Sequence, residues 1–469
     1  MKFTRKVFSG CSSLMFSALI LTSATTVRAD QNGDDAPNYL LTTRIVNRCN
    51  PTENPQGPQV PAPLVANAGC PSVHPNANWS VDISWFDPVF EKAYIADRDN
   101  KALDIVDTRS DTVVGQATGF VGVVAGTNTS GPNGVVTTHN PNQLWGGDGN
   151  GDVRIYSLDA KGLNPTLLKV VLATDPKLNV TRRADEVAYD PDHQLVLMAW
   201  DDAADLLMAF ITVNSSPTVV GTISLKTNCP ALSGCSTGGI EQPAYDRRIG
   251  RFLVSVPSST LHPNGEVLVI NPATLLVEKA WDTTDPLTGA ACNPNGLAIG
   301  PGHQALLGCS GGAVAGNPLV TLIIDDRGSG PNGSNVKVIK TITEVGASDE
   351  VWFNPGDNNY YTASSNFTST GKVGGTNFPV LGIIEAGNDR EGPEWIQNVV
   401  TGAGSHSVTA VYGFGCDRDD RDRDHGEGLH RNGCDHDHDD IVDNRVYVPL
   451  RTNQAGNSEV GGIGIVRRP

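Results

Sequence analysis

Short β-prone runs alternate with turn residues along most of the chain. Residues 92–96 and 102–106 predict two strands joined by a turn at 97–100, and residues 144–147 and 153–156 repeat the plan around 148–151. Gly (51 residues) and Pro (30 residues) are too frequent for long helices. At 39% hydrophobic residues, the chain has enough apolar material for a core. The pattern therefore predicts an all-β protein.

The chain also repeats itself. Five segments begin with a polar residue, continue with mostly apolar residues and end in a turn; they start at Asp82, Asp185, Glu241, Asn295 and Asp349. Two weaker copies start at Asn133 and His406, and successive starts lie 51 to 57 residues apart. Four short strands in each of seven repeats predict a single seven-bladed β-propeller over residues 30–469. A β-solenoid fits less well, because its repeat is usually much shorter.

The last repeat is one strand short. Its predicted strands lie near residues 406–414, 445–450 and 462–466. The β-prone stretch 38–46 precedes the first repeat and is expected to complete this sheet. Such closure would remove a free sheet edge.

Three local motifs resemble two known propeller families. Residues 94–107 (YIADRDNKALDIVD) resemble the strand–turn–strand unit of YVTN-type propellers. Residues 241–246 (EQPAYD) and 294–298 (PNGLA) are similar to the Glu- and Asn-bearing motifs of the gluconolactonase/regucalcin family. The second resemblance implies a calcium-type ion held by Glu, Asn, Asn and Asp at the inner strand starts of a six-bladed propeller. Glu241, Asn295 and Asp349 match three of these positions, and Asp185 or Asn133 would replace the second Asn.

A propeller would bring the seven repeat starts together near one mouth of its channel. Four clustered carboxylates must be protonated, hydrogen-bonded or bound to a cation. Oxygen ligands favour calcium or magnesium, so a divalent cation, calcium first, is the predicted cofactor. Asp82 or His406 would then act as general base on a water. The alternative is that these side chains only satisfy strand-start amides or face channel water.

The amino terminus predicts export. Residues 1–29 combine a positive end, an apolar stretch from Leu14 to Leu21 and a small-residue cleavage site, as in a secretory signal peptide. The apolar stretch is shorter than the about 20 residues that span a bilayer. The net charge of −17 argues against nucleic acid and anionic lipid as partners. We therefore expect a secreted or periplasmic protein that does not insert into a membrane and is a monomer.

Eight cysteines follow the predicted signal peptide and fall into four sequence-near pairs. These pairs are Cys49–Cys70, Cys229–Cys235, Cys292–Cys309 and Cys416–Cys434. Near partners have the lowest loop-closure cost, so four local disulfides are predicted. A zinc site would need CxxC spacing, which the chain lacks.

The Asp/His-rich run 416–440 is expected to be a loop inserted in the last blade. Its alternating aspartates resemble part of a calcium loop, although a solvated mixed-charge segment is the simpler interpretation. Two functions remain open from the sequence. One is a metal-dependent lactone or ester hydrolase; the other is a non-catalytic scaffold that binds a small molecule, a glycan or a protein.

Overall fold

The computed structural model describes twelve stretches of the chain. They are residues 39–46, 80–124, 127–285, 289, 291–310, 319–329, 334–368, 379–388, 391–401, 404–412, 445–450 and 462–467. Within these residues the secondary structure is all β, with no helix. No helix there meets the length and hydropathy that a membrane span requires. The predicted signal peptide (1–29) and the 416–440 segment lie outside the described residues.

The strands form small antiparallel sheets in chain order. The first is β2 (Val81–Asp87), β3 (Lys92–Asp97), β4 (Ala102–Asp107) and β5 (Thr112–Thr118). The second is β6 (Val135–Thr138), β7 (Gln143–Gly147), β8 (Val153–Ser157) and β9 (Thr166–Val171). The third is β10 (Glu186–Asp190), β11 (Leu195–Trp200), β12 (Leu207–Thr212) and β13 (Val219–Ser224).

The next two groups of four join into one larger sheet. The groups are β14 (Pro243–Asp246), β15 (Arg251–Val256), β16 (Glu266–Asn271), β17 (Leu276–Asp282), and β18 (Pro294–Ile299), β19 (Gln304–Cys309), β20 (Thr321–Ser329), β21 (Asn335–Ile342). Their outer strands β17 and β21 meet in a single parallel pair, Asp282 opposite Asn335. The link makes an eight-stranded sheet out of two units that otherwise resemble the rest.

Two further four-stranded sheets complete the described fold. One is β22 (Val351–Asn354), β23 (Asn359–Thr368), β24 (Pro379–Glu385) and β25 (Glu394–Val400). The other combines β26 (Thr409–Val411), β27 (Arg445–Leu450) and β28 (Gly462–Arg467) with β1 (Leu40–Val46). Strand β1 runs antiparallel to β28, from Leu40 opposite Arg467 to Val46 opposite Gly462.

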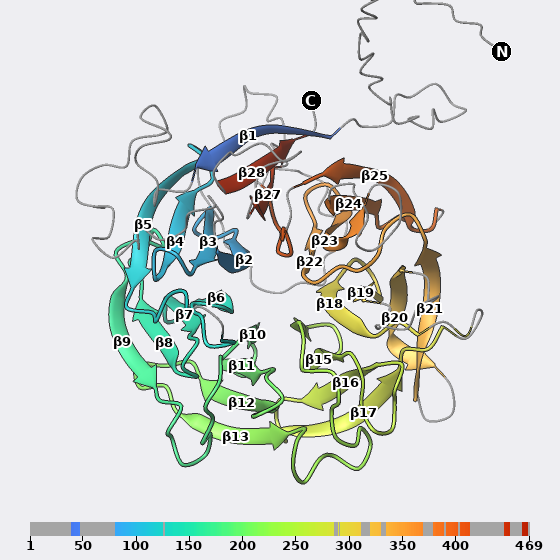
Figure 1. The fold of residues 1–469 in the computed structure, drawn as a ribbon, viewed down its shortest axis with the longest axis horizontal. Coiled ribbons are helices and arrows are strands. Elements are labelled where there is room, and N and C mark those ends of the chain that lie inside the picture. The colour runs from blue at the N-terminus through green and yellow to red at the C-terminus, as the bar shows by residue number, and fades with distance from the viewer. Residues whose placement is uncertain are drawn as a thin grey trace, which may run out of the picture. The chain divides into compact units, whose positions relative to one another are not determined.

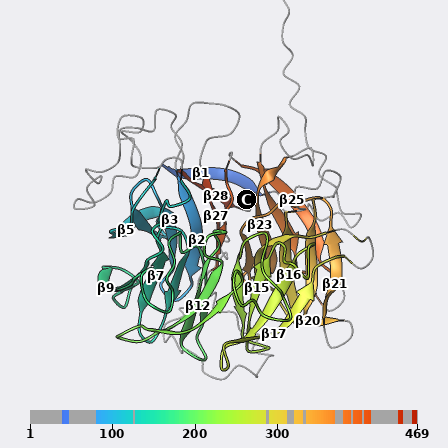
Figure 2. The same ribbon diagram turned by 60° about the horizontal axis from the view of Figure 1, so that its bottom comes forward.

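The sheets stand side by side around a central axis, which is a propeller-type arrangement (Figures 1 and 2). The innermost strand is the first of the four in each unit except the last, where it is β26 and β1 is outermost. Each innermost strand contacts the next in the order β2, β6, β10, β14, β18, β22, β26 and back to β2. Hydrophobic clusters fill the spaces between neighbouring sheets. Trp145 and Trp200, for example, are fully buried between the second and third sheets. The core is therefore divided into inter-sheet layers.

Most outer strands carry the same irregularity. The register slips by one residue between the third and fourth strands of the sheets that end in β5, β9, β13, β17, β21 and β25. A bulge at this position increases the local twist of the outer strand.

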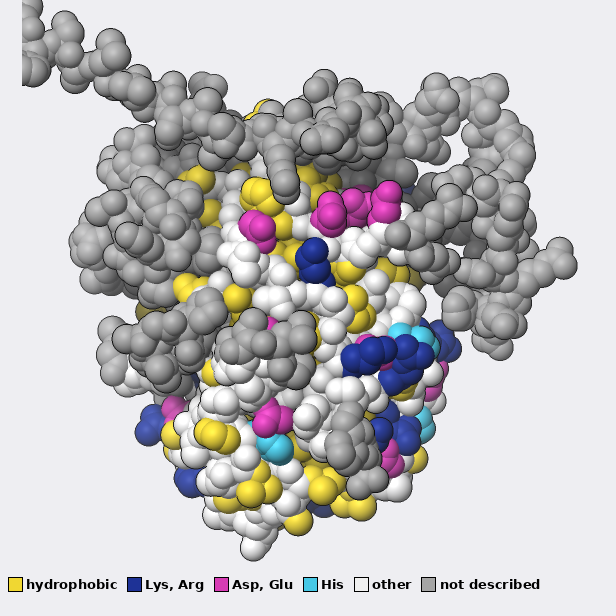
Figure 3. All heavy atoms as spheres, turned by 90° about the vertical axis from the view of Figure 1, so that its right-hand side faces the viewer, with side chains coloured by type: hydrophobic (Ala, Val, Ile, Leu, Met, Phe, Trp, Pro, Cys, Tyr) yellow, Lys and Arg dark blue, Asp and Glu magenta, His cyan; other side chains and the backbone are white. Residues whose placement is uncertain are grey.

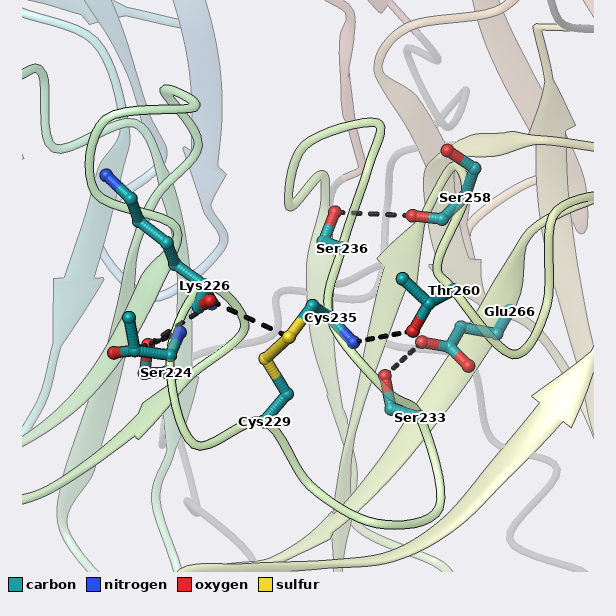
Figure 4. The surroundings of a disulfide bond; sticks show 10 residues. Ser224, Lys226, Cys229, Ser233, Cys235, Ser236, Ser258, Thr260 and Glu266 are labelled. Carbon is teal, nitrogen blue, oxygen red and sulfur yellow. Dashed lines mark hydrogen bonds between the residues drawn. A yellow bond between two sulfur atoms is a disulfide. The ribbon is translucent and has the colours of Figure 1, made fainter.

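Two of the four predicted disulfides are confirmed. Cys229–Cys235 and Cys292–Cys309 are bonded, whereas Cys49, Cys70, Cys416 and Cys434 lie outside the described residues. Figure 4 shows that the first bond closes a loop whose Ser233 hydroxyl donates to the buried Glu266 carboxylate. Burial raises the pKa of Glu266 to about 7. These disulfides are compatible with an extracellular protein.

Basic side chains on the surface lie over buried carboxylates. Figure 3 shows Lys and Arg side chains gathered beside a His on the side of the molecule where β20 and β21 lie. Arg327 and Lys337 both contact Asp325, at 2.6 and 3.0 Å, and Asp325 itself is buried. The contact with Arg327 holds the pKa of Asp325 far below its ordinary value.

Candidate functional site

The predicted repeat starts lie where the innermost strands begin. Asp82 and Asn295 are within β2 and β18, and the other five stand one to three residues before their strands. Two of these residues, Asn133 and Asn295, are followed by glycine, because the backbones of neighbouring strand starts approach closely there. A Cβ on Gly134 would lie 1.9 Å from the Asp185 carbonyl oxygen, and one on Gly296 would lie 2.8 Å from that of Asp349. Only glycine lets these neighbouring strand starts come so near.

Arg98 contacts both Asp82 and Asn133. The Arg98 guanidinium, which follows β3, is ion-paired with the Asp82 carboxylate. It also donates to Asn133 Oδ1, from Nε at 3.0 Å and from Nη2 at 2.6 Å. The Asn133 amide in turn donates to the Ala184 carbonyl oxygen at 3.2 Å. Arg98 and Asn133 together therefore link the first three sheets at their strand starts.

A second arginine serves two carboxylates. Arg183 Nη2 lies 2.7 Å from Asp185 Oδ2 and 2.7 Å from Asp201 Oδ2. Its Nε donates to the other Asp201 oxygen at 3.1 Å, so that pair is bidentate. Burial raises the pKa of Asp185, and the Arg183 charge opposes that effect. Arg183 therefore supplies positive charge to two carboxylates of the third sheet.

His406 connects two aspartates of the ring. Its Nδ1 lies 3.1 Å from Asp349 Oδ2, and its Nε2 lies 3.6 Å from Asp82 Oδ1. Burial would lower the pKa of His406, but the hydrogen bond to Asp349 and the two carboxylate charges raise it. For Asp349 the effects are reversed: burial would raise its pKa, but the hydrogen bond and charge of His406 hold that pKa below its ordinary value. Asn295 Nδ2 donates to the same carboxylate at 3.1 Å.

Three glutamates near the axis have raised pKa values. Glu186 and Glu350 interact electrostatically with each other, although the sheets that contain β10 and β22 are not neighbours. Burial and nearby carboxylates raise the pKa of Glu350 to about 8 and raise that of Glu186 as well. Burial and the charge of Asp349 also raise the pKa of Glu241.

Further contacts join the innermost strands of different sheets. Gln242 Nε2 donates to the Val351 carbonyl oxygen at 3.1 Å, and its Oε1 accepts from Leu297 N at 2.8 Å. The rings of Trp85 and Trp352 meet edge to face, with centroids 5.2 Å apart. Several side chains of the site are partly exposed, among them Asp349 (38%), Arg183 (21%), His406 (18%) and Arg98 (14%). The candidate site is therefore polar and partly open to solvent.

The structure brings together most of the residues expected from the sequence. Asp82, Asn133, Asp349, Asn295 and His406 are linked through direct contacts. Asp185 and Glu241 lie near them, since the charge of Asp82 acts on the pKa of Asp185 and that of Asp349 acts on Glu241.

Sequence reasoning missed the cations and the acid pair. Arg98 and Arg183 lie outside the repeat register, so the register did not select them. The acid pair did leave a signal: Asp185-Glu186-Val187 and Asp349-Glu350-Val351 are the same tripeptide at the same register position.

Cationic side chains contact most of the predicted calcium ligands. They contain no group of three or more His, Cys, Asp or Glu side chains placed to hold a metal ion. Guanidinium groups engage Asp82, Asn133 and Asp185, and an imidazole engages Asp349. These contacts supply the positive charge that the clustered carboxylates require.

Comparison with known proteins identifies the fold. No family model matches the chain, and no curated protein matches it. The structure of U3-55K is similar over 83% of this chain and 96% of its own, with 8% identity and a TM-score of 0.51. The Pan2 WD40 domain of Neurospora crassa aligns over 85% of this chain and 92% of its own, with 12% identity and a TM-score of 0.48. The likeness to U3-55K shows a shared fold and nothing more. The chain is thus a propeller-type protein.

Proposed function

We propose that the protein is a seven-bladed propeller, closed by β1, that acts outside the cytoplasm as a binding protein. The cycle of contacts among seven innermost strands supports the blade count. The pairing of β1 with β28 supports the closure. The two disulfides and the signal-like residues 1–29 support a secreted or periplasmic location.

The charge balance at the mouth supports a neutral, hydroxyl-rich ligand, such as a sugar unit of a glycan. The positive groups Arg98, Arg183 and His406 face the negative groups Asp82, Asp201 and Asp349. Because the ring neutralises itself, it offers no excess charge to attract an ion. It does offer exposed donors and acceptors from several sheets, which is the set that hydroxyl groups need.

The proposal is tested by titrating the protein with neutral mono- and oligosaccharides and measuring binding by ligand-observed NMR. Uronic acids and amino sugars serve as charged comparisons. Asp349→Asn should weaken binding of the neutral sugars by about tenfold, because Asp349 is the most exposed acceptor of the mouth. Glu394→Gln, on the exposed end of β25, is the matched control. If no neutral sugar binds, or if Asp349→Asn binds it as the parent does, the proposed ligand class is wrong.

Metal-dependent lactone or ester hydrolysis stays a prediction from the sequence. The contact between Asn295 and Asp349, beside Glu241, is the observation in its favour. Its test is thermal melting with and without a chelator, then calcium titration, with lactone turnover measured in parallel. Calcium should raise the melting midpoint of the parent and not that of Glu241→Gln. If calcium and chelator leave the parent unchanged, this candidate is excluded.

A further inference from the structure

A groove lies between the outer strands β9 and β13. It encloses about 480 Å³ and is lined by Lys169, Val171, Leu172, Lys177, Pro217 and Val219. Its walls are the end of β9 with the following turn and the segment that enters β13. It lies at the rim of the ring, on the green strands of Figure 1, and is separate from the channel mouth.

The equivalent junction elsewhere in the ring is closed by backbone pairing. The end of β17 meets the start of β21 there, with Asp282 opposite Asn335. The end of β9 and the start of β13 are the corresponding segments, and no strand pair joins them in the described structure. The groove therefore lies between two neighbouring sheets, at the position where β17 and β21 of another sheet pair are joined by backbone pairing.

At the groove, two lysine side chains donate hydrogen bonds to backbone carbonyl groups. Lys169 Nζ donates to the Pro217 carbonyl oxygen, and Lys177 Nζ donates to the Val219 carbonyl oxygen at 2.6 Å. Neither ammonium is ion-paired with a carboxylate of the described residues; Asp175 accepts from the Lys177 backbone N–H at 2.9 Å. Exposed lysines are a common guard on sheet edges. Here they also give the groove positive charge in a chain of net charge −17.

The rim beside the groove is unusually apolar. Leu167, Leu168 and Leu172 are 50%, 38% and 53% exposed, and Val220 across the groove is 45% exposed. Among the described residues, β5 and β25 expose no large hydrophobic side chain, and β17 and β21 expose one each. Clustered exposed apolar groups mark interaction surfaces more often than scattered ones do.

We propose that this groove binds an extended peptide segment of a partner protein, one in which acidic and aliphatic residues alternate. The peptide lies along the free edge of β9 as an added strand. Its backbone N–H groups replace the lysine ammoniums at the Pro217 and Val219 carbonyls. The released ammoniums pair with its carboxylates, and its aliphatic side chains cover the exposed leucines. This surface is independent of the ligand proposed for the channel mouth.

The test uses a fluorescein-labelled peptide of about ten residues with alternating Glu and Val, and a Lys and Val peptide as comparison. Fluorescence anisotropy should show binding of the acidic peptide and a loss of at least about tenfold in affinity for Lys169→Glu/Lys177→Glu. Lys279→Glu/Lys340→Glu is the matched control, because it changes the net charge equally on the outer strands β17 and β21. Leu172→Ser, which keeps both lysines, should also weaken binding.

Hydrogen exchange locates the binding site. The bound peptide should protect the amides of β9, and the melting midpoint of each variant shows whether it is folded. Three results would overturn the proposal: no binding of the acidic peptide, equal binding of both peptides, or equal losses in the groove and control variants. Sedimentation that shows self-association lost only in the groove variants would make this face an interface between copies, which also overturns it.

Discussion

Replacing Glu350 by Gln should make the protein less sensitive to rising pH. Glu350 keeps its proton in the folded state up to a pKa of about 8, whereas the ordinary value is 4.5. Between these values the folded protein binds more protons than the unfolded chain. Stability from this group is therefore complete below about pH 4.5 and is lost as the pH rises to about 8. Glu350→Gln removes the titration and keeps a neutral hydrogen-bonding side chain.

The magnitude follows from the same pKa values. Each pH unit in the window costs about 1.4 kcal/mol, so the upper limit is about 5 kcal/mol. Glu350 is coupled to Glu186, whose pKa is also raised and which keeps its own titration in the variant. We therefore expect about half of the limit, about 2–3 kcal/mol, as the gain of the variant over the parent near pH 8.

Urea unfolding at about pH 5, 7 and 8.5, followed by tryptophan fluorescence, measures this difference. Trp352 lies two residues from Glu350 and contacts Trp85 across the axis, so the signal reports on the same region. Glu394→Gln should follow the parent at every pH. Parallel curves for Glu350→Gln and the parent, or a variant that loses more stability than the parent as the pH rises, would refute the reasoning.

Three further predictions concern stability. Arg183→Met leaves the Asp185 and Asp201 carboxylates without their cation and should lower the free energy of unfolding by about 3–5 kcal/mol in urea titration; a loss below about 1 kcal/mol would contradict the pairing. Cys292→Ser/Cys309→Ser should lower the free energy of unfolding by about 2–4 kcal/mol and lower the melting midpoint. An unchanged midpoint would contradict a stabilising role for this disulfide. Deleting residues 40–46 exposes the edge of β28 and should cause aggregation in light scattering; a monodisperse, equally stable product would disprove that role.

Much of the fold was predictable because local signals repeat. The turn residues and apolar runs recur every 51 to 57 residues, and each repeat start stands at or just before an innermost strand. The two described disulfides join sequence neighbours, so short loop closure was a sufficient guide to them.

The chemistry of the site was harder to predict because it depends on contacts between distant residues. The sequence indicated that clustered carboxylates need positive charge, but not that Arg98 and Arg183 supply it. Arg98 reaches Asn133 of the next sheet, and the Glu186–Glu350 pair crosses the axis between sheets that are not neighbours. Periodicity along the chain carries no information on such partners.

The pairing of β1 with β28 also sets an order of events during synthesis. Most sheets are built from consecutive strands, so each can form once its own segment of about 50 residues has emerged. The sheet that contains β1 must instead wait, because Leu40 meets Arg467 only after the whole intervening chain has been made. This long-range closure has the highest entropic cost of any pairing in the ring. Until it occurs, the first strand to be synthesised stays without its partner and is exposed to chaperones, proteases and other nascent chains.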